Sequence, residues 1–213
     1  MYQYVFFDLD GTLTDPGIGI TNSVMYALKK WNIEVADRSE LYSFIGPPLV
    51  DSFKKYYGFS EEDAKQAVVY YREYFSVTGL YENTIFDGTK KLLADLKAAG
   101  KKVVLATSKP QEFAEIILNH FDIAQYFDTV AGAMMNGGRT NKTDVILYAL
   151  ETCGIEDKSQ VIMVGDREHG IIGAKNAGLD SIGVLCGYGD REELETAGAT
   201  YIVEKIEDVW ELV

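Results

Sequence analysis

Two aspartates, Asp8 and Asp10, follow directly after a short apolar run at residues 4–7. Side chains two positions apart leave an extended chain on the same side, so both carboxylates can face one pocket. Two carboxylates that face each other repel, which favours a bound cation or a raised pKa on one of them. The alternative is structural, because an aspartate in this position also caps turns and helices.

A second polar group, Thr107, Ser108 and Lys109, follows the apolar run at residues 102–106. A hydroxyl at the end of a strand could hydrogen-bond an anion. The alternative interpretation is a helix N-cap or a turn residue.

Two further residues, Lys142 and Asp166, stand where predicted elements begin or end. Lys142 opens a predicted helix, where its positive charge opposes the helix dipole; the alternative is an ordinary surface lysine. Asp166 follows the apolar run at residues 161–164 and either binds a metal or caps the next helix.

The elements that must position these residues alternate between strand and helix patterns. Predicted strands cover residues 4–7, 102–106, 129–131, 161–164, 181–185 and 199–203. Predicted helices cover residues 88–99, 111–121, 142–153, 171–177 and 191–197. This alternation predicts an α/β fold with a Rossmann-like parallel sheet, which binds ligands outside the carboxyl ends of its strands.

The segment 16–83 interrupts the alternation, because it contains no convincing strand. Helical patterns occur around residues 18–31, 38–45, 48–57 and 60–77. We therefore expect a catalytic core from residues 1–15 and 84–213, with an all-helical domain inserted after the first strand. The many tyrosines of the insertion are interpreted as packing between its helices.

Composition limits the classes of partner. The 213 residues are 47% hydrophobic and 25% charged, as in a packed globular protein. The formal charge of −13 argues against a nucleic-acid partner. The two cysteines have no metal or disulfide spacing, and no signal peptide or membrane span is evident, so we expect a cytoplasmic protein.

The order of these motifs resembles the haloacid dehalogenase superfamily of phosphohydrolases over essentially the whole chain. The most specific match is Asp8-Leu9-Asp10-Gly11-Thr12. The helical insertion resembles the cap of the phosphoglycolate-phosphatase-like branch, and Ile45-Gly46-Pro47-Pro48-Leu49 is similar to its 5′-nucleotidases.

The resemblance implies a role for each polar residue. Asp8 is the nucleophile that forms an aspartyl-phosphate, and Asp10 protonates the leaving alkoxide and then deprotonates the attacking water. Thr107 and Lys142 hold the phosphoryl oxygens in the transition state. The implied phosphate-binding residues are Gly11, Thr107, Ser108, Lys109 and Lys142.

The resemblance also implies a magnesium ion, bound by Asp8, by the backbone carbonyl of Asp10 and by Asp166. The family motif continues as Gly-Asp-x-x-x-Asp, whereas this chain has Gly170 in place of the second acid. Without that acid, we expect weaker magnesium binding or a misoriented metal-bound water. If the acid supports the metal ligands, the loss of metal affinity or activity is about 10–100-fold. Glu168 is the alternative acid, although it stands two residues after Asp166 and the second acid of the motif stands four residues after it.

Together these features predict a magnesium-dependent phosphatase that acts on a nucleoside 5′-monophosphate or on phosphoglycolate. The alternatives are a phosphomutase of the same superfamily and a noncatalytic phosphate-ligand sensor whose site is impaired at Gly170. The expected partner is a small phosphorylated metabolite, not nucleic acid or a membrane, and the expected state is a monomer or weak homodimer.

Overall fold

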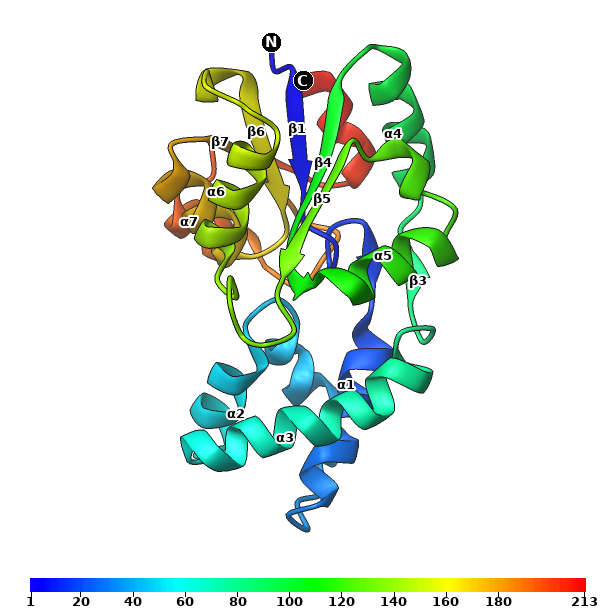
Figure 1. Cartoon of the computed structure of the whole chain (residues 1–213), viewed down its shortest axis with the longest axis vertical. Helices are drawn as coiled ribbons and strands as arrows, with labels where there is room; N and C mark the ends of the chain where they lie inside the picture. Colours follow the sequence, from blue (N-terminus) through cyan, green and yellow to red (C-terminus); the bar gives the residue numbers. More distant parts are fainter. The chain divides into compact units, whose positions relative to one another are not determined.

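The computed structural model describes all 213 residues, which divide into two compact units (Figure 1). The larger unit comprises Met1–Thr14 and Ile85–Val213, and the smaller one comprises Asp15–Thr84. A two-stranded sheet of β2 (Thr14–Asp15) and β3 (Thr84–Ile85) forms where the chain passes between them.

The larger unit is built on a six-stranded sheet in the order β5-β4-β1-β6-β7-β8. Every neighbouring pair is parallel, which confirms the predicted α/β fold. The strands are β1 (Tyr4–Phe7), β4 (Lys102–Pro110), β5 (Thr129–Ala133), β6 (Val161–Gly165), β7 (Asp180–Val184) and β8 (Tyr201–Val203).

The central strand β1 sets the position of the polar residues. Phe7, the last residue of β1, lies opposite Leu105 of β4 and Val164 of β6, so the three strands run toward the same edge of the sheet. The residues that follow them therefore meet there, as in other open parallel sheets.

Five α-helices accompany this sheet. They are α4 (Thr89–Ala98), α5 (Gln111–His120), α6 (Lys142–Thr152), α7 (Glu168–Ala177) and α8 (Arg191–Ala197). Short 3₁₀ helices cover Ala124–Tyr126, Lys158–Gln160 and Ile206–Leu212. Helices α6 and α7 bury Val145, Ile146 and Ala174 against Phe6, Val104 and Met163, one from each of β1, β4 and β6. Within a strand, the residues of this cluster are two positions apart, as the strand period requires.

Several predicted boundaries are wrong in an informative way. Strand β4 continues to Pro110, so Thr107, Ser108 and Lys109 belong to a strand rather than to a turn. Its pairing with β5 is irregular between Ala106 and Pro110. The sequence did not predict this extension, because apolar periodicity cannot detect a strand that carries polar residues at its end. Helix α7 begins at Glu168, three residues before its first buried apolar side chain, Ile171.

The smaller unit is helical. It contains α1 (Gly17–Lys29), a 3₁₀ helix (Arg38–Phe44), α2 (Leu49–Tyr57), α3 (Glu61–Tyr74) and a π-helix (Phe75–Gly79). The helix predicted at residues 60–77 therefore changes to a π-helix at Phe75, and this π-helix ends at Gly79, which packs closely against Gly19 of α1.

Aromatic rings fill the interior of this unit. The Phe44 and Phe53 centroids are 5.0 Å apart, and Tyr71 stacks on Phe75. The packing interpretation therefore fits Tyr71, whereas Tyr42 and Tyr81 are exposed. No helix of the chain combines the length and the hydropathy needed to cross a bilayer.

Replacing Phe6 by alanine should lower the free energy of unfolding by about 3–5 kcal/mol, because Phe6 is fully buried at the centre of the sheet. Equilibrium urea unfolding measures the change. Ile116→Ala on the exposed face of α5 is the control and should shift stability by about 0.5 kcal/mol or less. Equal losses in the two variants would contradict the described core.

Candidate active site

Two buried ion pairs occupy the carboxyl end of β1. Lys142 Nζ lies 2.7 Å from Asp8 Oδ2, and Lys109 Nζ lies 2.9 Å from Asp10 Oδ2. The four side chains are between 3% and 11% exposed. Each carboxylate that follows β1 therefore has its own buried ammonium group, one from α6 and one from β4.

A third buried carboxylate, Asp166, comes from the end of β6. Its Oδ1 accepts a hydrogen bond from Thr12 Oγ1 at 3.2 Å, and its Oδ2 accepts one from the Tyr188 backbone N–H at 2.9 Å. Burial, with a further contribution from the Asp8 carboxylate, raises the pKa of Asp166 to about 7. Asp166 has hydrogen bonds to neutral donors but no buried ammonium partner.

The carboxyl group of Asp10 is suited to holding a proton. Burial raises its pKa, and the Asp8 carboxylate adds to the effect, whereas Lys109 opposes it. Its second oxygen, Oδ1, is buried and makes no hydrogen bond. An unsatisfied buried oxygen of this kind is available to a reacting group.

Gly11 is required by the close approach of the turn to Asp166. Its φ is +77°, and a Cβ at this position would lie 2.0 Å from Asp166 Oδ2. Its N–H donates to Thr14 O at 2.8 Å, which closes the turn. A side chain here would displace the carboxylate, so glycine is needed both for conformation and for space.

Lys142 is buried at the first turn of α6, a helix whose start has a side-chain cap. The N-cap is Asn141, whose side chain accepts from the Asp144 N–H at 2.9 Å. Lys142 Nζ donates to Ala106 O at 3.1 Å in addition to its ion pair with Asp8. Gly173 of α7 leaves space for the lysine stem, since a Cβ there would lie 2.8 Å from Lys142 Cγ.

Thr107 and Ser108 differ in their placement. Thr107 is buried, and its Oγ1 accepts from the Lys109 N–H at 3.2 Å. Ser108 is half-buried and has no hydrogen bond to another predicted site residue. The structure therefore brings Asp8, Asp10, Lys109 and Lys142 into direct contact, whereas Ser108 lies outside that set.

The donor set fits a hard divalent cation such as magnesium. No group of three or more His, Cys, Asp or Glu side chains is placed to hold a metal. Burial, followed by the Asp8 carboxylate, raises the pKa of Asp166, and a bound cation would favour its ionised form. The oxygen donors available are those that magnesium prefers.

The position of the missing acid is buried and has space for a side chain. A Cβ on Gly170 would have its nearest neighbour, Gly165 Cα, at 3.7 Å, an ordinary van der Waals distance. Glu168 does not supply a buried acid instead, because its carboxylate is about half exposed and lies 3.7 Å from His169 Nδ1.

The segment Gly187-Tyr188-Gly189 holds Asp166 and was not predicted as part of the site. A Cβ on Gly187 would lie 2.4 Å from Asp166 Oδ2, and one on Gly189 would lie 2.1 Å from Asp166 O. The available signal was a pair of glycines just beyond the predicted strand at residues 181–185. The hydrogen bond that Thr12 donates to Asp166 could not be predicted, because the sequence marks Thr12 only as part of the Asp8–Thr12 motif.

Comparison with known proteins gives a consistent family. The haloacid dehalogenase-like hydrolase family matches residues 5–184. The 5'-nucleotidase of Pseudomonas aeruginosa is 44% identical over 94% of this chain and 90% of its own length. Tyrosine-protein kinase PtkA of Mycobacterium tuberculosis is 38% identical over 94% of this chain and 68% of its own. The crystal structure of a predicted phosphatase from Clostridium acetobutylicum has a TM-score of 0.97 and 49% identity, covering 100% of this chain and 98% of that one.

The pKa of Asp166 predicts a pH effect on the stability of the metal-free protein. The folded state keeps this proton up to about pH 7, whereas an unfolded aspartate loses it near its ordinary pKa of 3.8. The folded state therefore binds more protons between about pH 4 and pH 7, and this group's contribution to stability falls as the pH rises.

Urea unfolding of the chain and of Asp166→Asn at pH 4.5 and pH 7.5, roughly the limits of that window, measures this contribution in the presence of a chelator. The stability of the chain relative to the variant should fall as the pH rises. Magnesium, added in place of the chelator, should reverse the fall. A difference that is constant with pH would mean that Asp166 ionises normally.

Proposed function

The chain belongs to the haloacid dehalogenase-like hydrolase family and is a phosphatase, and on that premise we propose that it hydrolyses a small phosphate monoester in a magnesium-dependent reaction. A nucleoside 5′-monophosphate is the first substrate to test, because the 5'-nucleotidase of Pseudomonas aeruginosa is 44% identical over nearly the whole chain. Phosphoglycolate is the second.

The observation that carries the proposal is the pair of buried lysines that hold Asp8 and Asp10 beside Asp166. The Asp8 carboxylate pairs with Lys142 Nζ through Oδ2 at 2.7 Å and accepts a hydrogen bond from the Leu9 N–H through Oδ1 at 2.8 Å. Asp10 has a raised pKa and a free oxygen. A carboxyl group with a raised pKa next to a carboxylate with a buried ammonium partner suits an acid/base beside a nucleophile.

In the first step, an Asp8 carboxylate oxygen attacks phosphorus and the bond from phosphorus to the ester oxygen breaks. The departing alkoxide takes the proton held by Asp10, which leaves an aspartyl-phosphate at Asp8. In the second step, a water attacks phosphorus and gives a proton to Asp10. The acyl phosphate bond breaks, and inorganic phosphate leaves with both aspartates in their starting state.

Positive charge near the phosphoryl oxygens stabilises the transition state of both steps. Lys142 supplies this charge, and the Thr107 hydroxyl supplies a hydrogen bond. The remaining lysine, Lys109, limits how far burial raises the pKa of Asp10. These local charges attract a phosphate ester despite the formal charge of −13.

Magnesium would be held by Asp8, by the backbone carbonyl of Asp10 and by Asp166. When bound, it would neutralise charge between the carboxylate and the phosphate. The smaller unit, Asp15–Thr84, is proposed to act as a cap that limits substrate size and excludes water.

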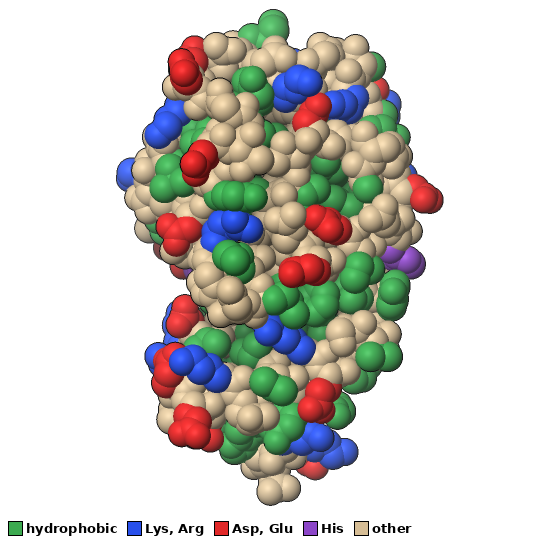
Figure 2. All heavy atoms as spheres, in the orientation of Figure 1, with side chains coloured by type: hydrophobic (Ala, Val, Ile, Leu, Met, Phe, Trp, Pro, Cys, Tyr) green, Lys and Arg blue, Asp and Glu red, His purple; other side chains and the backbone are tan.

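The acceptor of the phosphoryl group separates hydrolysis from related reactions. A phosphomutase transfers it to a second sugar hydroxyl, and a relative 38% identical is named as a tyrosine kinase. On the face shown in Figure 2, acidic and basic side chains are interspersed without a continuous basic surface, as expected for a small-molecule enzyme rather than a nucleic-acid binder.

Replacing Asp8 by asparagine should lower kcat on the order of 10³-fold or more, because the amide cannot serve as the nucleophile. The assay measures phosphate release from nucleoside 5′-monophosphates, phosphoglycolate and sugar phosphates across a magnesium titration. Asp122→Asn is the control, since Asp122 is exposed and its φ of +54° is tolerated by asparagine.

Three results would contradict this proposal. Activity that survives in Asp8→Asn would place the nucleophile elsewhere. Phosphoryl transfer to a sugar or tyrosine hydroxyl in place of release to water would identify a transferase. Silence across the panel, in this chain and in a variant with the missing acid restored, would favour a noncatalytic sensor.

Restoring the acid by Gly170→Asp should lower the magnesium concentration for half-maximal activity by about 10-fold, because an added carboxylate orients the metal ligands and bound water. The position has space for the Cβ. Gly170→Asn, which has the same shape without the charge, is the matched control. Equal magnesium dependence in all three proteins would show that this site functions without the second acid.

A further inference from the structure

Helix α7 begins two residues after Asp166 and has no side-chain cap from its own N-cap residue, Arg167. Its third residue is Gly170, and a glycine inside a helix lowers the intrinsic stability of that helix. The first N–H groups of a helix have no partner within the helix, so they must be satisfied from outside. The segment that follows Asp166 therefore depends on support from another part of the fold.

Glu193 of α8 supplies this support. Its Oε1 accepts a hydrogen bond from the Glu168 N–H at 2.7 Å and another from Arg167 Nε at 2.8 Å. The Arg167 and Glu193 side chains are only 16% and 22% exposed, so solvent and salt screen this ion pair weakly. The carboxylate satisfies the first N–H of α7 and complements the positive end of the helix dipole. One oxygen thus holds both residues that follow Asp166.

Helix α8 keeps Glu193 in this position. Asp190 caps the helix, because its Oδ1 accepts from the Glu193 N–H at 2.8 Å. The next residue, Leu194, is fully buried and packs with Ile171 of α7. Gly183 of β7 leaves space for this leucine, since a Cβ there would lie 2.8 Å from Leu194 Cδ1. Glu193 therefore cannot leave the start of α7 without disturbing the packing of α7 and α8.

The loop that precedes α8 confines Asp166 itself. The Tyr188 N–H donates to Asp166 Oδ2 at 2.9 Å. Gly189 lies so close to the same residue that a Cβ there would be 2.1 Å from Asp166 O. The segment 188–193 therefore contacts both Asp166 and the two residues after it, and a shift of this segment would move the Asp166 carboxylate.

From these contacts we propose that Glu193 is the positioning residue for Asp166, and that it gives this site the support that an acid in place of Gly170 would otherwise give. Glu193 acts through Arg167 and the Glu168 N–H, not as a ligand of the metal. The proposal rests on the proposed function, because the magnesium ion that Asp166 would help to hold serves that reaction.

The test measures how magnesium stabilises the full chain against urea, which reports metal binding whether or not phosphate is released. Glu193→Ala should raise the magnesium concentration for half-maximal stabilisation by about 10-fold, because groups that support metal ligands change metal affinity by about 10–100-fold. Saturating magnesium should restore kcat, and KM for the phosphate ester should then be unchanged. A purely structural role would instead lower stability equally at every magnesium concentration.

A second variant, Glu193→Gln, keeps an acceptor oxygen for the Glu168 N–H and removes only the charge opposite Arg167. It should shift the half-maximal magnesium concentration in the same direction by a smaller factor, so the test does not depend on Glu193→Ala alone. No shift in either variant would overturn the proposal.

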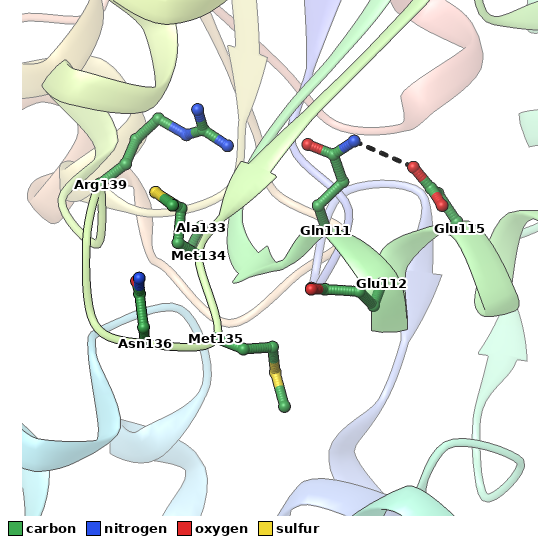
Figure 3. Close-up of a pocket in the computed structure, with 8 residues that line it drawn as sticks. All are labelled: Gln111, Glu112, Glu115, Ala133, Met134, Met135, Asn136 and Arg139. Atoms are coloured by element: carbon green, nitrogen blue, oxygen red, sulfur yellow. Dashed lines mark hydrogen bonds between the residues drawn. The ribbon is translucent and has the colours of Figure 1, made fainter.

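Glu115→Ala is the matched control. Glu115 is a glutamate of α5, which packs against β4 and β5, and its carboxylate accepts from Gln111 Nε2 at 3.0 Å. Both residues line a cavity of about 430 Å³ between α5 and the β5–α6 loop (Figure 3). This variant loses the same charge and the same side-chain length as Glu193→Ala, and it should leave the magnesium concentration for half-maximal stabilisation unchanged.

The Gly170→Asp background tests whether Glu193 takes the place of the missing acid. In that background Glu193→Ala should raise the half-maximal magnesium concentration by a smaller factor than in the unaltered chain, because two groups that support one ligand do not act additively. Equal factors in the two backgrounds would overturn the proposal.

Failure of the proposed function gives a different result, namely no Asp8-dependent phosphate release from any ester. The urea titrations then test Glu193 by themselves, and a shift in Glu193→Ala still supports its positioning role. Phosphate release that requires Asp8, together with equal magnesium binding in the chain and in Glu193→Ala, overturns this inference and leaves the proposed function in place. A chain that magnesium does not stabilise also overturns the inference.

Discussion

The burial of three carboxylates at one edge of a parallel sheet is the constraint on which the rest of this structure depends. Asp8 and Asp10 are each neutralised by a buried lysine, whereas Asp166 is held by a hydroxyl and a backbone N–H. The site therefore has three acids and only two lysines. The unmatched acid is unfavourable, because buried charge without a partner is costly. A divalent cation held by Asp8 and Asp166 would offset this excess of negative charge.

The fold provides this arrangement by bringing distant segments to one place. Strand β1 supplies two acids, and its neighbours β4 and β6 supply Lys109 and Asp166. The turn at Gly11 allows the chain to pass against Asp166 at a distance that any side chain would prevent. The backbone segments around Asp166 are therefore packed closely, and close packing of this kind favours the preorganised groups on which electrostatic catalysis depends.

Much of this was predictable from sequence because the signals are local. Apolar runs followed by aspartate locate the ends of β1 and β6, and Lys142 stands out because its charge opposes a helix dipole. Thr107 does not mark a strand end, because β4 continues to Pro110. The pairing of Lys109 with Asp10 was not predictable in detail, since it depends on a strand that continues to Pro110 through polar residues. Likewise, the cavity between α5 and the β5–α6 loop depends on tertiary packing that periodicity does not record.

The central claim is that Asp8 becomes phosphorylated during turnover. The most direct measurement is mass spectrometry of the Asp10→Asn variant, quenched in acid after brief exposure to 4-nitrophenyl phosphate with magnesium. The good leaving group removes the need for an acid, and loss of the base slows attack by water, so the intermediate accumulates. The account predicts one added phosphoryl group on the peptide that contains Asp8. No phosphoryl group on the protein, or one on a different residue, would contradict it.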